Sequence, residues 1–343
     1  AKLFREDNQD YYNKNIELAK LQSFFNPFIH VLSNISYMLL LFFGAKEVMA
    51  GTMLLGDFIA FNAYLGLMMW PARALGMVIA FMQRGAASMD RLTNIFRTEP
   101  EIVDREGAIE LDEIKGNIEF KNVSFKYAPE LPYALKDISF NIEPGKTLAI
   151  LGRTGSGKSS IVNVLLRLYD INEGEILVDG HEVKDVTLNS LRENISYVPQ
   201  DDFLFSKTVK ENIEFHYEHE LDDEMIEKYA KIAGVYDDII EFKDGFDTIL
   251  GERGVTLSGG QKQRVSIARA LAKEKNVLIM DDSLSAVDTQ TEEEILKNLN
   301  TDEADVSKII ISHRVSTIKD ADEILFIEDG AIVERGTHDE LVS

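Results

Sequence analysis

Hydrophobic residues are distributed along this chain in two different ways. Residues 24–44 and 58–82 form nearly continuous apolar runs, each about as long as a helix needs to cross a bilayer. From residue 116 onward the apolar positions come in shorter, partly alternating groups. The stretches 116–127 and 134–151 are of this kind, and their pattern predicts β-strands. We therefore expect two membrane-spanning helices followed by a separate domain that contains a sheet.

Four polar residues interrupt the two apolar runs: His30, Asn34, Asn62 and Arg73. Facing lipid would be costly for them, so we expect them to face other helices or a water-filled cavity. They are candidates for a transport path, and hydrogen bonding between helices is the alternative interpretation. A soluble amphipathic hairpin is a further alternative for the two runs, and their length and apolarity disfavour it.

Positive residues flank the two runs unevenly. The connecting stretch 45–56 carries only Lys46, whereas the outer flanks carry Lys2, Arg5, Lys14, Lys20, Arg84, Arg91 and Arg97. The positive-inside tendency then places both ends in the cytoplasm and 45–56 outside. Residues 1–21 are polar and helix-prone, so we expect them to extend the first helix into the cytoplasm. The chain starts inside this helix with no signal-like segment, so we expect it to be part of a longer protein.

Charge marks a boundary near residue 100. The first hundred residues hold nine Lys and Arg against eight Asp and Glu, whereas the remainder holds 27 against 51. We expect a partial transmembrane domain at 1–100, a charged linker at 101–115 and a soluble domain at 116–343. The net charge of −23 argues against nucleic acid as a partner. The absence of cysteine excludes disulfides and thiolate metal sites.

The most specific motif is GRTGSGKSS at 152–160, which fits G-x-x-x-x-G-K-[ST] between a predicted strand and a predicted helix. Backbone N–H groups of such a loop bind phosphates, Lys158 reaches the β- and γ-phosphates, and Ser159 ligates Mg²⁺. A glycine-rich loop alone could bind a dinucleotide, but Lys-Ser directly after the last glycine selects a nucleoside triphosphate. The expected ATP-binding residues of the loop are Gly152, Arg153, Thr154, Gly155, Ser156, Gly157, Lys158, Ser159 and Ser160.

The stretch LSGGQKQR at 257–264 resembles the signature of the ATP-binding cassette (ABC) family. The resemblance implies further roles for residues that match family motifs in order and spacing. Tyr127 would stack on adenine, Gln200 would contact Mg²⁺ and the interface to the membrane domain, and His313 would contact the γ-phosphate. GERG at 251–254 looks like the short loop with which exporters contact the partner's intracellular helices.

The resemblance covers the whole chain and extends to ABC exporters. It implies a multi-domain fold of all-α transmembrane helices followed by an α/β P-loop nucleotide-binding domain with a helical subdomain. The chain would be the C-terminal part of a half-transporter in the cytoplasmic membrane, exporting an unidentified substrate with ATP and Mg²⁺. Its partner would be a second half-transporter. The signature residues would then serve the nucleotide held by that partner, namely Leu257, Ser258, Gly259, Gly260 and Gln261.

Two adjacent acids end the apolar stretch VLIMDD at 277–282. By resemblance Asp281 is the magnesium acid, together with Ser159 and Gln200, and SLSAVD at 283–288 is the D-loop that crosses to the partner site. The family places a catalytic glutamate where this chain has Asp282, so the resemblance implies catalytic roles for Asp282, His313, Gln200 and Lys158.

Because aspartate is one methylene shorter than glutamate, we expect a slow site. Heterodimeric exporters pair such a chain with a partner that supplies a glutamate and a degraded signature. That arrangement is favoured, and a homodimer with two slow sites stays open. A nucleotide-gated regulatory subunit that binds ATP with little or no hydrolysis is the alternative function.

Overall fold

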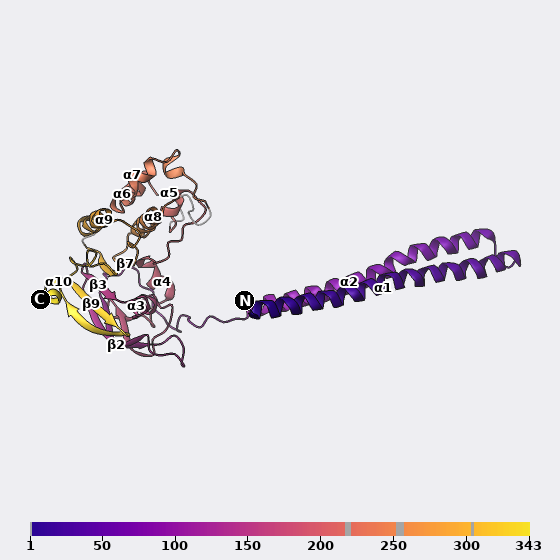
Figure 1. Ribbon diagram of the computed structural model, residues 1–343, viewed down its shortest axis with the longest axis horizontal. Helices are drawn as coiled ribbons and strands as arrows, with labels where there is room; N and C mark the ends of the chain where they lie inside the picture. Colours follow the sequence, from indigo (N-terminus) through magenta and orange to yellow (C-terminus); the bar gives the residue numbers. More distant parts are fainter. Residues whose placement is uncertain (1, 217–220, 252–256, 303–304) are drawn as a thin grey trace. The chain divides into compact units, whose positions relative to one another are not determined.

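The computed structural model describes residues 2–216, 221–251, 257–302 and 305–343. It divides into two compact units, Ala1–Glu99 and Pro100–Ser343. Figure 1 shows a long helical hairpin in the first unit and a mixed arrangement of sheets and helices in the second. The charge boundary near residue 100 therefore coincides with a structural division.

The first unit consists of two long helices, α1 (Lys2–Met49) and α2 (Leu55–Phe96), with Pro27 and Pro71 inside them. A tight turn around Gly51, whose φ is +75°, joins them. The helices lie close together near this turn, because a Cβ atom at Gly44 would approach the Phe58 ring to 2.6 Å. A larger residue at this point would force the Phe58 ring to shift.

The apolar character of the hairpin is concentrated near its turn. Among the described residues, His30–Met49 is long and apolar enough to cross a membrane, and only 11% of it is buried within the chain. Leu55–Met68 is a shorter apolar stretch at the start of α2, and the predicted span 58–82 continues past it through some positions whose side chains are outside the described part of the chain. His30 and Asn34 are exposed and Asn62 is half-buried. The side chain of Arg73 lies outside the described part of the chain.

The second unit contains two sheets. The smaller one has the order β2-β1-β4-β5 and is antiparallel, and the larger one has the order β10-β9-β3-β8-β7-β6. In the larger sheet β9, β3, β8, β7 and β6 are parallel, and β10 is antiparallel at the edge. The strands are β1 (Ile118–Phe125), β2 (Leu135–Ile142), β3 (Thr147–Gly152), β4 (Glu173–Val178), β5 (His181–Glu182), β6 (Ile195–Val198), β7 (Val277–Asp281), β8 (Ser307–Ile311), β9 (Glu323–Glu328) and β10 (Ala331–Gly336).

Helices of the second unit fall into two groups. In Figure 1 the helices α5 to α8 gather at one end of the unit, and α8 packs against β6 of the larger sheet. They share a hydrophobic core that is distinct from the core between the sheets. The helices are α3 (Lys158–Leu165), α4 (Leu188–Glu193), α5 (Val209–Ile213), α6 (Asp223–Ile232), α7 (Tyr236–Ile240), the 3₁₀ turn Gly245–Asp247, α8 (Gly259–Ala272), α9 (Thr289–Asp302) and α10 (His338–Val342).

The predicted strands 116–127 and 134–151 correspond to β1, β2 and β3. Strand β7 is buried at every position, which explains why its sequence VLIMD shows no polar alternation. The segment predicted as a linker, 101–115, belongs to the second unit. Ile114 is buried there, and the backbone of Ile109 pairs with Asp185 and Thr187.

Candidate functional site

The loop between β3 and α3 has the conformation that a phosphate cradle requires. Gly157 immediately precedes α3 with φ of +109°, and a Cβ atom there would come within 2.5 Å of the Ala134 carbonyl oxygen. Only glycine fits such a position. No side chain among the described residues caps α3, which leaves backbone N–H groups at its start available to a phosphate.

Lys158 is held in place by the loop itself. Its Nζ donates hydrogen bonds to the carbonyl oxygens of Gly152 (2.8 Å) and Arg153 (3.0 Å). Burial lowers the pKa of Lys158, while the negative charges of Asp282 and Asp281 oppose that change. The Ser156 hydroxyl in the same loop is buried and has no hydrogen-bond partner in the part of the chain that the structure describes. The loop therefore carries a partly desolvated cation and an unused polar group, as expected of a site for an anionic ligand.

A cavity of about 320 Å³ adjoins this loop. It brings together residues from five separate parts of the sequence, and most of the predicted ATP-binding and catalytic residues line it. Gly152, Arg153 and Ser156 belong to the loop without lining the cavity. The lining residues are Tyr127, Ala134, Thr154, Gly155, Gly157, Lys158, Ser159, Ser160, Gln200, Asp281, Asp282, Ile311 and His313.

Tyr127 forms an aromatic wall of the cavity and leaves 43% of its surface exposed. Its hydroxyl lies 2.9 Å from the Ser160 hydroxyl and accepts a hydrogen bond from Asn163. Its ring meets the rings of Phe125 and Tyr169 edge-on, with centroids 4.7 Å and 5.0 Å away. These contacts fix the ring beside the loop. Tyr169 contributes to this support and was not predicted from the sequence.

Two adjacent acids end β7 and differ in their surroundings. Asp281 is only 3% exposed, and burial raises its pKa, while a hydrogen bond with Ser159 opposes that rise. Asp282 is half-buried with a left-handed backbone (φ +49°), and its N–H donates to the Ile311 carbonyl oxygen of β8 at 2.9 Å. Among the described residues no cluster of three or more His, Cys, Asp or Glu side chains could hold a metal. The predicted magnesium set uses one hydroxyl, one amide and one carboxylate, and such hard oxygen donors suit Mg²⁺ when phosphates complete the shell.

The signature lies at the start of α8 and does not line the cavity. Ser258 caps this helix: its hydroxyl accepts from the Gln261 backbone at 3.2 Å, and the Gln261 side chain accepts from the Ser258 backbone at 2.9 Å. Gln261 also donates to Asp238. Leu257 is buried, and Gly259 and Gly260 lie against Ala286. In GERG only Gly251 is described; the rest of that predicted loop lies outside the described residues.

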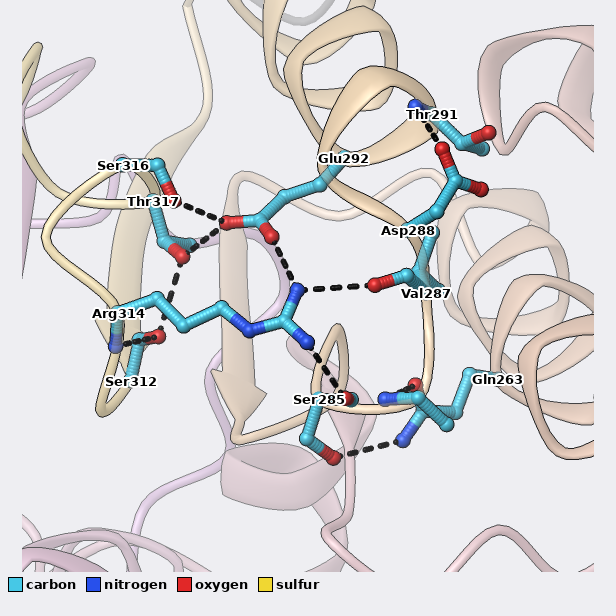
Figure 2. A network of polar contacts seen from close by, with 11 residues as sticks. Gln263, Ser285, Val287, Asp288, Thr291, Glu292, Ser312, Arg314, Ser316 and Thr317 are labelled. Carbon is cyan, nitrogen blue, oxygen red and sulfur yellow. Dashed lines mark hydrogen bonds and ion pairs between the residues drawn. The ribbon is translucent and has the colours of Figure 1, made fainter.

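A group of polar residues next to His313 was not predicted from the sequence. Figure 2 shows Arg314 between the loop 283–288 and the buried carboxylate of Glu292 on α9. No short sequence pattern indicates these contacts, because the residues that contact Arg314 are 22 to 29 positions away from it in the chain. One indication was present in the sequence, which is the arginine directly after His313.

Comparisons with known proteins agree with this geometry. Residues 135–285 match the family model described as ABC transporter, and residues 1–72 match the ABC transporter transmembrane region. The probable multidrug resistance ABC transporter ATP-binding/permease protein YheI of Bacillus subtilis is 43% identical over 340 residues, which cover 99% of this chain and 58% of that protein. The ATP-dependent lipid A-core flippase of Photobacterium profundum is 40% identical over 330 residues, which cover 96% and 56%.

A solved structure is also similar. It is that of a bacterial Atm1-family ABC exporter with ATP bound, with a TM-score of 0.76 and 37% identity over 85% of this chain and 50% of that chain. The present chain thus spans less than two thirds of the length of the relatives that it matches. All of these matches are to ABC transporter proteins, and together they cover residues in both units of the chain.

Proposed function

The chain belongs to the ABC transporter family, with features of an exporter half-transporter, and from this premise we propose that it drives export of a substrate across the cell membrane by binding and hydrolysing ATP. The apolar parts of α1 and α2 near their turn lie in the membrane, the outer ends of both helices extend into the cytoplasm, and the second unit lies in the cytoplasm. The observation that carries the proposal is the single cavity that collects Lys158, Asp281, Asp282 and His313 beside the phosphate loop.

In the proposed reaction this chain's residues mainly position charge. The loop N–H groups and Lys158 hold the phosphates, and the ammonium offsets negative charge that develops on the transferred phosphoryl group. Ser159, Gln200 and Asp281 hold Mg²⁺, which supplies further charge neutralisation when bound. His313 contacts the γ-phosphate, and Asp282 orients the attacking water.

The proposed partner is a second half-transporter. The signature residues from Leu257 to Gln261 do not line this chain's own cavity, which supports a role at the nucleotide of the partner. Loop 283–288 would cross to the same place. Substitution of Ser258 by Ala should therefore impair hydrolysis of the partner's ATP and leave nucleotide contacts at Lys158 intact, and site-resolved trapping of nucleotide can show which of the two sites is lost.

Asp282 makes this chain's own site slow. Its carboxylate falls short of a glutamate's reach by roughly one ångström, and such a displacement can cost about 100-fold in rate. The backbone has little freedom to compensate, because the Asp282 N–H is bonded to Ile311 on the neighbouring strand. We therefore favour a heterodimer in which a glutamate-bearing partner carries most of the turnover.

The variants Asp282→Glu and Asp282→Asn test this assignment. A barrier of about 2.7 kcal/mol corresponds to the 100-fold loss, and Asp282→Glu should recover part of it. In a heterodimer Asp282→Asn should scarcely change total ATPase activity, whereas in a homodimer it should remove nearly all. Steady-state ATPase assays of both variants, with and without the co-expressed partner, separate the two cases. A nearly inactive Asp282→Asn complex that contains a glutamate-bearing partner would contradict the slow-site assignment.

The short acid at position 282 also favours one second candidate, a nucleotide-gated regulatory subunit that binds ATP with little hydrolysis. Both functions include ATP binding, so affinity does not separate them. Reconstituted transporter in sealed vesicles does. Substrate movement that needs ATP and stops with a non-hydrolysable analogue supports export, and movement that continues with the analogue supports nucleotide gating.

A further inference from the structure

Arg314 joins three parts of the second unit through its guanidinium group. Nη1 donates to the Val287 carbonyl oxygen at 2.9 Å and to the Glu292 carboxylate at 2.6 Å, and Nη2 donates to the Ser285 carbonyl oxygen at 2.8 Å (Figure 2). One planar side chain thus binds two backbone positions of loop 283–288 and the first turn of α9. Arg314 itself immediately follows His313, whose side chain lines the nucleotide cavity.

Glu292 anchors this arrangement. Its side chain is fully buried, whereas that of Arg314 is 39% exposed. Besides Arg314, the Glu292 carboxylate accepts hydrogen bonds from the hydroxyls of Ser316 and Thr317. It also lies in the first turn of α9, where the helix dipole favours negative charge. A buried carboxylate with this many donors is a fixed point rather than a surface ion pair.

The same hydroxyls fix the backbone on both sides of His313. The Arg314 N–H donates to the Ser312 hydroxyl at 3.0 Å, which donates to the Thr317 hydroxyl at 3.1 Å, which in turn donates to Glu292. Because each hydroxyl has one proton, this chain of donors runs in a single direction and ends on the carboxylate. The residues before and after His313 are therefore tied to the same anchor.

Gln263 extends the connection to the signature helix. Its side-chain oxygen accepts from the Ala286 N–H at 2.8 Å, and its amide donates to the Ser285 hydroxyl at 3.1 Å (Figure 2). Gln263 lies on α8, two residues after the signature, and is 4% exposed. Loop 283–288 is thus held from one side by Arg314 and from the other by α8.

We propose that Arg314 is a positioning residue, anchored by Glu292, that transmits γ-phosphate contact at His313 to loop 283–288 and the start of α8. The inference rests on the proposed function, because loop 283–288 and the signature would serve the partner's nucleotide. Through Arg314, ATP binding at this chain's own site changes the positions of loop 283–288 and of the signature, which contribute to the partner's site. The link requires arginine, because only its planar fork reaches two carbonyl oxygens and a carboxylate together, whereas lysine is a point charge on a flexible stem.

The test uses the full transporter and hydrogen–deuterium exchange of peptides that cover 283–288. In the wild type, ATP with Mg²⁺ should slow exchange there, and ADP should not. Arg314→Lys should abolish the ATP-dependent slowing while exchange without nucleotide changes by less than about twofold, since α8 still holds the loop. His313→Ala should abolish the slowing too, and the double variant should show no further change.

Lys319→Gln is the matched control. Lys319 pairs with Glu293, the next residue of α9, but at 3.9 Å and with both side chains about half exposed. Such a pair should contribute little, so ATP-dependent slowing should persist in this variant. Glu292→Gln keeps the shape of the anchor without its charge and should reproduce part of the Arg314→Lys effect. It serves as the second variant in case Arg314→Lys folds poorly.

Steady-state kinetics give an independent measurement. Arg314→Lys should lower kcat by about tenfold and change the KM for ATP by less than about twofold, because positioning is lost and nucleotide binding is kept. Retained ATP-dependent slowing in Arg314→Lys overturns the inference. So does equal acceleration of exchange with and without ATP, which indicates a purely structural role. A wild type that shows the slowing without hydrolysing ATP would instead contradict the proposed ATPase and leave this inference standing.

Discussion

The phosphate loop (residues 152–160) differs from the Arg314 network in how its polar groups are hydrogen-bonded. The network consists of Arg314, the Glu292 carboxylate and the hydroxyls of Ser312, Ser316 and Thr317. In the loop, Lys158 donates hydrogen bonds to carbonyl oxygens of Gly152 and Arg153, and the Ser156 hydroxyl has no partner among the described residues. In the network, Glu292 and the hydroxyls of Ser316 and Thr317 are paired with one another or with Arg314. The phosphate loop borders the nucleotide cavity. In the network, Arg314 directly follows His313, which lines the same cavity.

This difference separates two tasks. Groups that will bind a ligand keep hydrogen-bonding capacity unused in its absence, and they are held by backbone geometry instead. Groups that position others are satisfied internally and gain rigidity from it. The following substitutions test this division, beginning with the largest expected effect.

Removing the anchor of the network should cost the most stability. Glu292→Ala leaves the Arg314 guanidinium and two hydroxyls without their common acceptor, and we expect the free energy of unfolding to fall by about 3 kcal/mol. Glu293→Ala, one position further along α9, should change it by less than about 0.5 kcal/mol because that side chain is exposed. Denaturant unfolding of both variants measures the contrast. Equal losses would mean that Glu292 is no special anchor.

Removing the cation of the loop should instead act on the ligand. Lys158→Ala should weaken ATP binding at this site by at least about 100-fold, equivalent to about 2.7 kcal/mol, because among the described residues that line the cavity Lys158 is the only lysine or arginine. Its stability without nucleotide should change little, since burial already disfavours the charged lysine. Labelling by a photoreactive ATP analogue provides the measurement, and undiminished labelling would contradict the assignment.

The glycines of the loop allow a finer comparison. Gly157→Ala should cost about 2–3 kcal/mol of stability, because the added Cβ meets the Ala134 carbonyl oxygen and the backbone is left-handed. Gly155 has φ of +83° but open space around its Cβ position, so Gly155→Ala should cost only about 1 kcal/mol. Thermal unfolding of the two variants side by side separates steric clash from backbone strain.

The smallest effect is expected at Ser156. Because its buried hydroxyl has no partner without ligand, Ser156→Ala should change stability by less than about 0.5 kcal/mol. ATP affinity should fall modestly, by about threefold, if the hydroxyl contacts phosphate when ATP is bound. Calorimetric titration with ATP, together with an unfolding curve, provides both values. A large loss of stability would show that this hydroxyl has a structural partner after all.

The same contrast explains what the sequence could predict. The phosphate loop is encoded locally: nine consecutive residues specify its glycines, its lysine and its helix start, so GRTGSGKSS was recognisable by itself. Most of the other residues that line the cavity were expected from the resemblance to the ABC family, whose motifs this chain carries in order. The strands of that sheet, and the separation of two units near residue 100, were also accessible from patterning and charge.

The Arg314 network was not predictable in this way. Glu292 looks like one of three consecutive acids on an exposed helix, and nothing local marks it as fully buried. Its burial depends on how α9 packs beside the segment after β8, which no short pattern encodes. Tertiary packing was the information that the sequence patterns lacked in this case.

The left-handed backbone at Asp282 has a consequence for how this position can change. Among residues other than glycine, Asp and Asn adopt positive φ most readily, because their short side chains bond to the local backbone. Glutamate has no such preference. A longer acid at 282 would therefore gain reach toward the water but would strain the backbone of the turn after β7. Conformational ease and catalytic reach therefore favour different residues at one position. Where a partner site carries the ATP turnover, catalytic reach at this position matters less, and aspartate is kept because it strains the backbone less.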